Sequence, residues 1–438
     1  MSAVARTRLD NGVVLIARPN RAAKSVAIQM VFEAGAAFDP ASKAGTAALV
    51  AGLLDRGAGT LSAAEIAATF DDLGIAYGAG AGRDSLEITL RLLSEHLPGV
   101  LERLRLIVSE PTFPEAEIGR EKGRLLTAIA ERDQNTAAVA EMAVQATLYP
   151  SGHPYRSPRL GSRDSVQRIE RSDLTAFHKS HLRPSGAIVS MAGDFDPARA
   201  IGLAANIFGA WNGGPGQSAR RAVRTPEAAS DRAARPPIPD PPAPGRMISV
   251  VRPIAGKTQA DIALGFRGLA RRSPDLPAVL VLDSILGEFS LGGRLGKAIR
   301  ERAGLAYYAY SHVTAGLGVG PFVARAGVAP ERVRRALELM RGTIAQVVRR
   351  GVSPSELRDS KQALSAAVPR RMETNPDAAE ILADAEFYGL GIDYPRHLPE
   401  LIRAVTRSQV EEAARKYLTL KSCVLVVAGP AMDKETLA

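Results

Sequence analysis

A pattern that returns after 236 residues constrains the fold of this chain more than any other feature of its sequence. Arg171-Ser172-Asp173-Leu174 returns as Arg407-Ser408-Gln409-Val410, and Ala192-Gly193 returns as Ala428-Gly429, with no gap in the spacing. Each copy has the signals of a helix that begins at a serine cap, followed by an apolar strand that ends in Ala-Gly. The spacing therefore predicts two similarly folded halves in one chain.

A stretch of different composition separates the two copies. Residues 213–246 contain eight prolines and six arginines but few large apolar side chains, which is typical of an extended, semi-rigid linker. A chain of 438 residues is also too long for one hydrophobic core and suits two domains of about 200 residues. We therefore predict an N-terminal domain at 1–214, a linker at 215–246 and a C-terminal domain at 247–438.

Charge and apolar patterning argue against several classes of protein. The net charge of +10 comes mostly from arginines scattered along the chain, which is typical of a solvated basic surface. Aromatic residues make up 5% and do not alternate with the basic residues, so we expect no nucleic-acid partner. No apolar run reaches the roughly 18–20 residues that a membrane-spanning helix needs, so we expect no membrane span. The single cysteine, Cys423, lies in an apolar run and is expected to be an unreactive core thiol.

The sequence leaves the cellular compartment open. Residues 1–7 are too short and too polar for the apolar core of a secretory signal, and a strand-like run begins at Val13. Two interpretations follow from this start. The protein is cytoplasmic, or this is a mature exported form whose leader has been removed.

The most informative helix is predicted within residues 43–57. It follows the strand-like run Val26–Phe32 and a turn-rich stretch that ends at Pro40, and Ser62 then provides a capping signal for a second helix. This layout resembles the pitrilysin (insulinase) family of zinc metallopeptidases, which carry the inverted motif H-x-x-E-H on the corresponding helix. Positions i, i+3 and i+4 share one face of a helix, so two histidines hold zinc there while the glutamate activates water.

The resemblance implies that this chain has lost the zinc site. Alignment on Gly45 places Ala48, Ala51 and Gly52 at the three positions of the motif. A later helix resembles the one that carries the family's third zinc ligand, and Ala128 stands at that ligand position. None of these side chains binds a metal or transfers a proton, so we expect no cofactor in this chain.

Further matches extend the resemblance over nearly the whole chain. His153-Pro154-Tyr155, the stretch Asp173–His181 and the closing Ala192-Gly193-Asp194 are similar to one segment of the family. The resemblance implies an α+β fold of two homologous domains, each a mostly antiparallel sheet packed against helices. His178 and His181 have the i, i+3 spacing of a chelating pair, but no nearby carboxylate completes a site, so we expect a structural or surface role.

A second stretch, residues 292–311, carries the candidate catalytic groups. A helix is predicted to end near Gly304, a glycine suited to a C-terminal cap, and a strand is predicted to start at Leu305. Arg300 then lies on the last helical turn, and Tyr307 lies early on the strand. Taken alone, the pattern favours a surface ion pair for the arginine and a core position for the tyrosine.

The family resemblance changes the interpretation of these two residues. Arg300 and Tyr307 are similar to a paired arginine and tyrosine that lie opposite the zinc and bind the substrate peptide carbonyl. If the predicted turn is displaced by one or two residues, Tyr308 or Tyr310 takes the place of Tyr307.

The resemblance implies the non-zinc subunit of a heterodimeric zinc metallopeptidase. A homologous subunit with H-x-x-E-H holds the zinc, and this chain forms half of a closed chamber around a peptide or small-protein substrate. By the same resemblance we expect a periplasmic location, with a cytoplasmic one as the alternative. The alternative function is a proteolytically silent structural or peptide-binding subunit that contributes nothing to catalysis.

Overall fold

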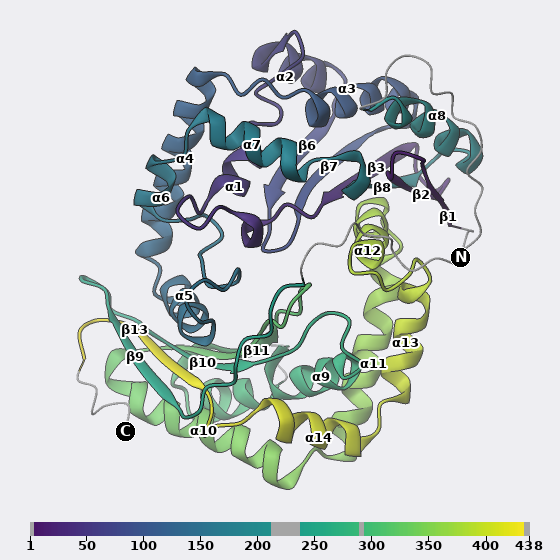
Figure 1. Cartoon of the computed structure of the whole chain (residues 1–438). Helices are drawn as coiled ribbons and strands as arrows, with labels where there is room; N and C mark the ends of the chain where they lie inside the picture. The colour runs from purple at the N-terminus through teal and green to yellow at the C-terminus, as the bar shows by residue number, and fades with distance from the viewer. Residues whose placement is uncertain (1–3, 212–236, 289–292, 433–438) are drawn as a thin grey trace. The chain divides into compact units, whose positions relative to one another are not determined.

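The computed structural model describes residues 4–211, 237–288 and 293–432 (Figure 1). Within these residues the chain forms two compact units, and each is built around one main β-sheet. None of the helices in these residues is both long enough and apolar enough to cross a membrane.

The first unit is organised around a six-stranded sheet with the strand order β1-β2-β8-β3-β7-β6. Neighbouring strands are antiparallel except β2 and β8, which are parallel. The central strands β3 and β8 are buried along almost their whole length, so both faces of the sheet must be covered there. The strands are β1 (Ala5–Arg8), β2 (Val14–Pro19), β3 (Ser25–Phe32), β6 (Ala76–Ala81), β7 (Leu86–Leu93) and β8 (Ile188–Gly193), with β4 (Gly57–Ala58) and β5 (Leu61–Ser62) as a separate short pair.

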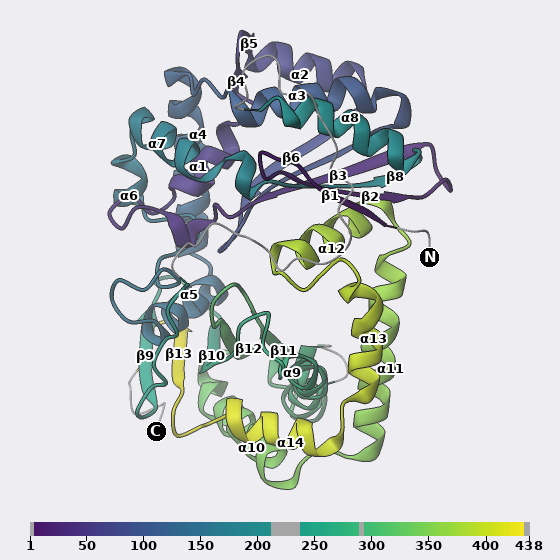
Figure 2. The same ribbon diagram turned by 45° about the vertical axis from the view of Figure 1, so that its right-hand side comes forward.

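Helices cover both faces of this first sheet. Figure 2 shows α3 and α8 on one face and α12 on the other. The capping box predicted at Ser62 is present, since its hydroxyl accepts from the N–H of Glu65 while the Glu65 carboxylate accepts from the N–H of Ser62. The helices are α1 (Thr46–Leu53), α2 (Ala63–Asp72), α3 (Leu97–Ser109), α4 (Glu115–Asp133), α6 (Arg163–Gln167), α7 (Arg171–His181), α8 (Pro197–Gly209) and α12 (Asn375–Phe387).

The second unit has a five-stranded sheet with the strand order β11-β12-β10-β13-β9. Only β13 and β9 are parallel. The strands are β9 (Ile248–Pro253), β10 (Ala260–Arg267), β11 (Ala306–Val313), β12 (Pro321–Val328) and β13 (Val424–Gly429). The helices are α5 (Thr136–Leu148), α9 (Leu276–Asp283), α10 (Val333–Arg350), α11 (Pro354–Arg371), α13 (Tyr394–Ala404) and α14 (Arg407–Tyr417).

The two sheets repeat one topology, as the sequence repeat predicts. Read from one edge, β9-β13-β10-β12-β11 repeats β2-β8-β3-β7-β6, including the single parallel pair. The repeated helix and strand of the sequence are α7 with β8 in the first unit and α14 with β13 in the second. The predicted α+β fold with two mostly antiparallel sheets packed against helices is therefore confirmed.

Each unit also contains one helix from the opposite half of the sequence. Helix α5 packs on β10 and β13 of the second sheet, whereas α12 packs on β3 and β8 of the first (Figures 1 and 2). A Cβ atom at Gly265 on β10 would lie 2.2 Å from Cγ1 of Val144 on α5, so the absence of a side chain at this position allows the close approach. The second compact unit thus includes residues 128–157, and the first includes residues 369–395.

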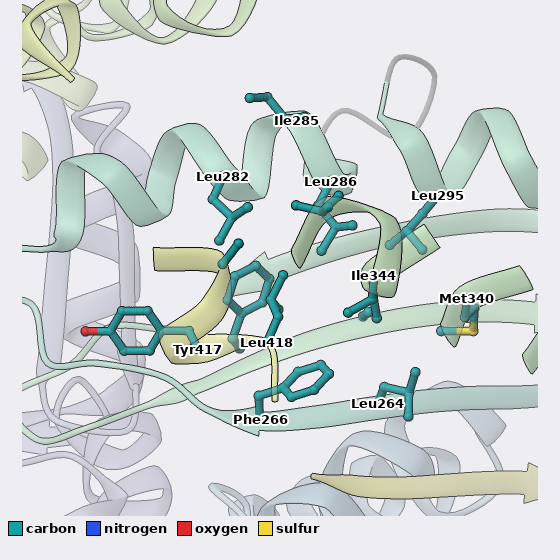
Figure 3. Close-up of a cluster of buried hydrophobic side chains, with 14 of the residues drawn as sticks. Leu264, Phe266, Leu282, Ile285, Leu286, Leu295, Met340, Ile344, Tyr417 and Leu418 are labelled. Carbon is teal, nitrogen blue, oxygen red and sulfur yellow. The ribbon is translucent and has the colours of Figure 1, made fainter. Parts of the chain in front are cut away.

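The core of the second unit lies on the other face of its sheet (Figure 3). Leu264 and Phe266 of β10 pack with Leu282 of α9 and Ile344 of α10, and all four are at most 1% exposed. Complete burial of one such side chain stabilises a fold by about 1.5–3 kcal/mol. Cys423 is also fully buried here, and burial raises the pKa of its thiol to about 11, which agrees with an unreactive core cysteine.

Only the end of the predicted linker is described, because residues 212–236 lie outside the described ranges. His153 Nε2 lies 2.8 Å from the carbonyl oxygen of Pro239, and Ser422 Oγ donates to the carbonyl of Pro244. Tyr155 accepts a 2.8 Å hydrogen bond from the N–H of Gly318 in the turn between β11 and β12. The His153-Pro154-Tyr155 motif therefore contacts both the end of the predicted linker and the turn between β11 and β12.

Candidate functional site: a helix without zinc-ligand side chains and an Arg/Tyr segment

Helix α1 of the first unit carries three of the four positions that align with the zinc ligands and the catalytic glutamate of the family. Ala48 and Gly52 are half-buried, and Ala51 is buried. Ala128, the fourth position, is half-buried on α4. A methyl group or a hydrogen atom offers no lone pair to a metal, so these positions do not fit zinc.

A carboxylate fills the space beside Gly52. A Cβ atom at this position would lie 2.4 Å from Oε1 of Glu121 on α4, which is closer than van der Waals contact allows. Glu121 is itself held by Arg124, whose Nη1 donates to it at 2.9 Å. A glycine in mid-helix costs about 1 kcal/mol relative to alanine, and this close approach gives a packing reason for that cost.

The start of α1 is held by structural contacts. Asp39 accepts hydrogen bonds from the N–H groups of Gly45 and Ala47, each at 2.7 Å. Burial opposes these hydrogen bonds and raises the pKa of the Asp39 carboxyl to about 7. Gly45 has a φ of +102°, a backbone conformation that favours glycine. The backbone conformation at this position therefore accounts for a glycine at residue 45.

The histidine pair His178 and His181 makes packing contacts in the first unit. His178 is buried, its Nε2 lies 2.8 Å from the carbonyl of Val108, and burial lowers the pKa of its imidazole. The ring of His181 packs between Phe177 and Phe38, with centroids 4.4 and 5.5 Å away. Across residues 4–211, 237–288 and 293–432, no three His, Cys, Asp or Glu side chains are grouped so that they could hold a metal ion.

Arg300 lies near the end of a helical segment in the second unit, as predicted. The segment Gly296–Arg302 is a π-helix, a form that is frequent at functional sites, and Ala303 is its C-cap. Gly304 follows with a φ of +62°, and its N–H donates to the carbonyl of Arg300 at 3.2 Å. The Arg300 side chain is exposed and has no ion-pair partner among the described residues, so the surface ion pair favoured by the bare pattern is not seen there.

Tyr307 lies at an irregularity of the edge strand β11. The pairing with β12 shifts between Ala306 and Tyr308, so Tyr307 is the extra residue of a β-bulge. Its side chain is 76% exposed, which contradicts the core position favoured by the bare pattern. A bulge re-aims a side chain, and this one gives Tyr307 an accessible phenol with no hydrogen-bond partner among the residues described.

The two alternative tyrosines are engaged within the unit. The hydroxyl of Tyr308 donates to Asp261, a buried carboxylate that also accepts from Thr136 at 2.5 Å. The ring of Tyr310 faces the guanidinium of Arg325, whose Cζ lies 5.8 Å from the ring centroid. Of the three tyrosines, Tyr307 is the most accessible to a molecule outside the unit.

Comparisons with known proteins identify the family of the chain. A family model described as Insulinase (Peptidase family M16) matches residues 13–161, and one described as Peptidase M16 inactive domain matches residues 168–364. An uncharacterized zinc protease of Mycobacterium leprae is 26% identical over 441 residues, which cover 99% of this chain and 93% of that protein.

Two solved structures extend the comparison to the fold. A peptidase M16 inactive domain from Pseudomonas fluorescens has a TM-score of 0.87 and 26% identity, and the match covers 98% of both chains. A protease from Helicobacter pylori has the same TM-score at 19% identity, covers 98% of this chain and 100% of that chain, and bears on the fold alone.

The chain belongs to the pitrilysin/insulinase-type M16 family of peptidases, which confirms the resemblance found in the sequence. Within that family, the match to the inactive-domain model and structure indicates an inactive M16 subunit of a zinc protease.

Proposed function

We propose that this chain is the non-zinc subunit of a heterodimeric zinc metallopeptidase and that Arg300 and Tyr307 bind the substrate peptide carbonyl at the partner's zinc site. One observation carries the proposal. The helix that would hold the metal offers only alanine and glycine at the ligand positions, whereas the segment with Arg300 and Tyr307 presents both side chains to solvent.

The two side chains suit a carbonyl oxygen that gains negative charge during peptide cleavage. Arg300 brings a permanent positive charge and a planar set of N–H donors, and Tyr307 brings a neutral O–H donor. Donors that are already positioned in a site from which water is excluded stabilise such an oxygen strongly, and removal of one typically costs about 10²–10³ in rate. Both groups bind and orient substrate, while the partner subunit supplies the metal and the hydrolytic chemistry.

The partner expected from this proposal is a homologous chain that bears H-x-x-E-H. The M. leprae relative is named a zinc protease and aligns over 93% of its own length, so chains of this size in the family are described as zinc enzymes. A chain without zinc ligands at the corresponding positions therefore needs such a chain to complete a site. The substrate class is a peptide or small protein.

A second candidate function is a silent structural or peptide-binding subunit. The description "inactive domain" of the matching model and of the P. fluorescens structure favours it. In that case the chain contributes surface to an assembly but no group that acts on the substrate.

Mixing the purified chain with a homologue that bears H-x-x-E-H separates the two functions. The assay follows a quenched fluorescent peptide with each chain alone and with an equimolar mixture. We expect cleavage by the mixture and at most trace cleavage by either chain. A partner whose motif glutamate is changed to glutamine serves as the control, because it should assemble and remain inactive. A partner that cleaves as fast alone as in the mixture contradicts the proposed function and favours the silent subunit.

A further inference from the structure

We propose that Asp283 is a positioning residue that fixes the Arg300 segment and the Tyr307 strand relative to each other. The inference rests on the proposed function and assigns a role to a residue that touches neither substrate nor metal. It starts from a buried carboxyl group that the carbonyl-binding pair does not itself use.

Asp283 joins the end of α9 to strand β11. It is the last residue of α9, it is 3% exposed, and its Oδ1 accepts a 2.5 Å hydrogen bond from Ser311 Oγ. The backbone N–H of Val313 donates to the same carboxyl group. Ser311 and Val313 are alternate residues of β11, the strand that carries Tyr307. One carboxyl group therefore holds the strand at two points.

The Asp283 carboxyl group lies in an apolar environment, which is unfavourable for its charged form. Its neighbours Leu282 and Ile285 belong to the buried core, and burial raises the pKa of Asp283 to about 6. An apolar residue of similar size would avoid that cost if the position served packing alone. The hydrogen bonds to β11 are what a carboxyl group provides here and an apolar side chain does not.

Close backbone contacts also connect strand β11 with the segment that carries Arg300. A Cβ atom at Gly287 would lie 2.7 Å from the backbone nitrogen of Ser311, so the chain after α9 passes directly against β11. A Cβ atom at Gly293 would lie 2.4 Å from the Cα of Gly287. Gly293 immediately precedes Arg294, and the π-helical segment with Arg300 begins two residues later.

Hydrogen bonds also fix the chain at Arg294, just before the Arg300 segment. The Arg294 guanidinium makes two hydrogen bonds of 2.7 Å with the carboxylate of Glu356 and one of 3.0 Å with the carbonyl of Gly351. The Arg300 segment is thus anchored at its start by Arg294. Strand β11 is anchored to α9 by Asp283. A substrate carbonyl needs both donors at once, and a displacement of about 1 Å can cost as much as 10²-fold in rate.

The test uses the full chain assembled with its H-x-x-E-H partner. Asp283→Asn removes the charge, and Ser311→Ala removes the donor without touching the carboxyl group. Asp275→Asn is the matched control, because Asp275 precedes the other end of α9 and accepts from Lys416 and Tyr417 at 2.7 Å each. Steady-state kcat, KM and the affinity between subunits are measured for each variant, alone and combined with Tyr307→Phe.

We expect Asp283→Asn and Ser311→Ala to lower kcat by about tenfold, with KM and subunit affinity within about twofold of the unmodified pair and with Asp275→Asn unchanged. In the Tyr307→Phe background, Asp283→Asn should lower kcat by less than about twofold, since its effect acts through that phenol. If Asp283→Asn does not fold by circular dichroism, Ser311→Ala decides the outcome. Unchanged kcat in the variants, or losses that multiply in full with Tyr307→Phe, overturns the positioning role.

The arms of the experiment also separate this inference from the proposed function. Full turnover in both Arg300→Ala and Tyr307→Phe removes the proposed carbonyl-binding role, and the positioning role of Asp283 is then overturned with it. Large losses in these two variants beside normal turnover in Asp283→Asn and Ser311→Ala overturn the positioning role alone.

Discussion

The packing of helix α5 on the second sheet leads to a quantitative prediction at one contact. Gly265→Ala places a Cβ atom 2.2 Å from Cγ1 of Val144, whereas carbon atoms pack best at about 3.5–4.0 Å. Val144 is 1% exposed and cannot turn away without a new clash or a cavity. Overpacking of this kind costs about 1–3 kcal/mol, so Gly265→Ala should destabilise the second unit by that amount.

The reciprocal substitution removes the obstacle. Val144→Ala deletes both γ-methyl groups and alone should cost about 2 kcal/mol in lost burial and cavity formation. The nearest remaining atom to a Cβ at position 265 is then the Cβ of residue 144, at 3.3 Å. The added methyl group partly refills the space, so Gly265→Ala should be nearly neutral in the Val144→Ala background. The expected coupling energy is about 1–2 kcal/mol.

Hydrogen exchange of the β10 amides, measured by mass spectrometry, reports this free energy locally. A loss of about 1–3 kcal/mol corresponds to exchange about 5- to 150-fold faster in Gly265→Ala. The double variant should exchange no faster than Val144→Ala alone. Additive effects of the two substitutions would refute the packing of α5 against β10.

Three further perturbations test other parts of the molecule. Glu356→Gln breaks the ion pair with Arg294 and should cost about 1–2 kcal/mol at pH 7. That pair lowers the pKa of Glu356 from 4.5 to about 2, so its contribution to the free energy of unfolding is complete above pH 4.5 and is lost as the pH falls through 2. The unfolding free energies of the two proteins, measured by urea titration, should therefore converge in acid. Asn375→Ala deletes a hydrogen bond from α12 to the carbonyl of Ser25 and should destabilise the first unit by about 1–3 kcal/mol. The fluorescence of Trp211 during urea unfolding measures this loss, and an unchanged unfolding midpoint would contradict the prediction. Treatment with a chelator should leave the Tm of the isolated chain unchanged, and a drop of several degrees would reveal a bound metal.

The duplication was predictable because it is recorded in local patterns. The repeated residue types and apolar runs identify α7 with β8 and α14 with β13, although the helices are capped by Glu170 and Thr406 and not by the predicted serines. The residues at the motif positions, Ala48, Ala51, Gly52 and Ala128, can be read directly from the sequence. These features depend on residue type and spacing alone.

The exchange of α5 and α12 was not predictable from local patterns. The buried positions of a helix show that it covers something apolar, but not which sheet it covers. The available signals were small residues at two places far apart in the sequence. They are the buried alanines Ala140 and Ala143 on α5 and Gly265 on β10. Only the fold brings them together.

The exposure of Tyr307 was also hidden from the sequence. Strict alternation would put Tyr307 on the same face as the buried Ala309, and the bulge cancels that rule at this residue. The one available sign was the pair of adjacent tyrosines, Tyr307 and Tyr308, which alternation cannot place on the same face. The same applies to Asp283, whose partner Ser311 on β11 lies 28 residues away in the chain.

The turnover of the assembled heterodimer with Tyr307→Phe tests the central claim most directly. This substitution removes one hydroxyl group that has no hydrogen-bond partner among the described residues, so it should leave folding and subunit affinity intact. If this subunit lends that phenol to the partner's reaction, kcat should fall by about 10²–10³. If kcat is the same as that of the unmodified pair, the chain contributes no such donor, and the account of its function is wrong.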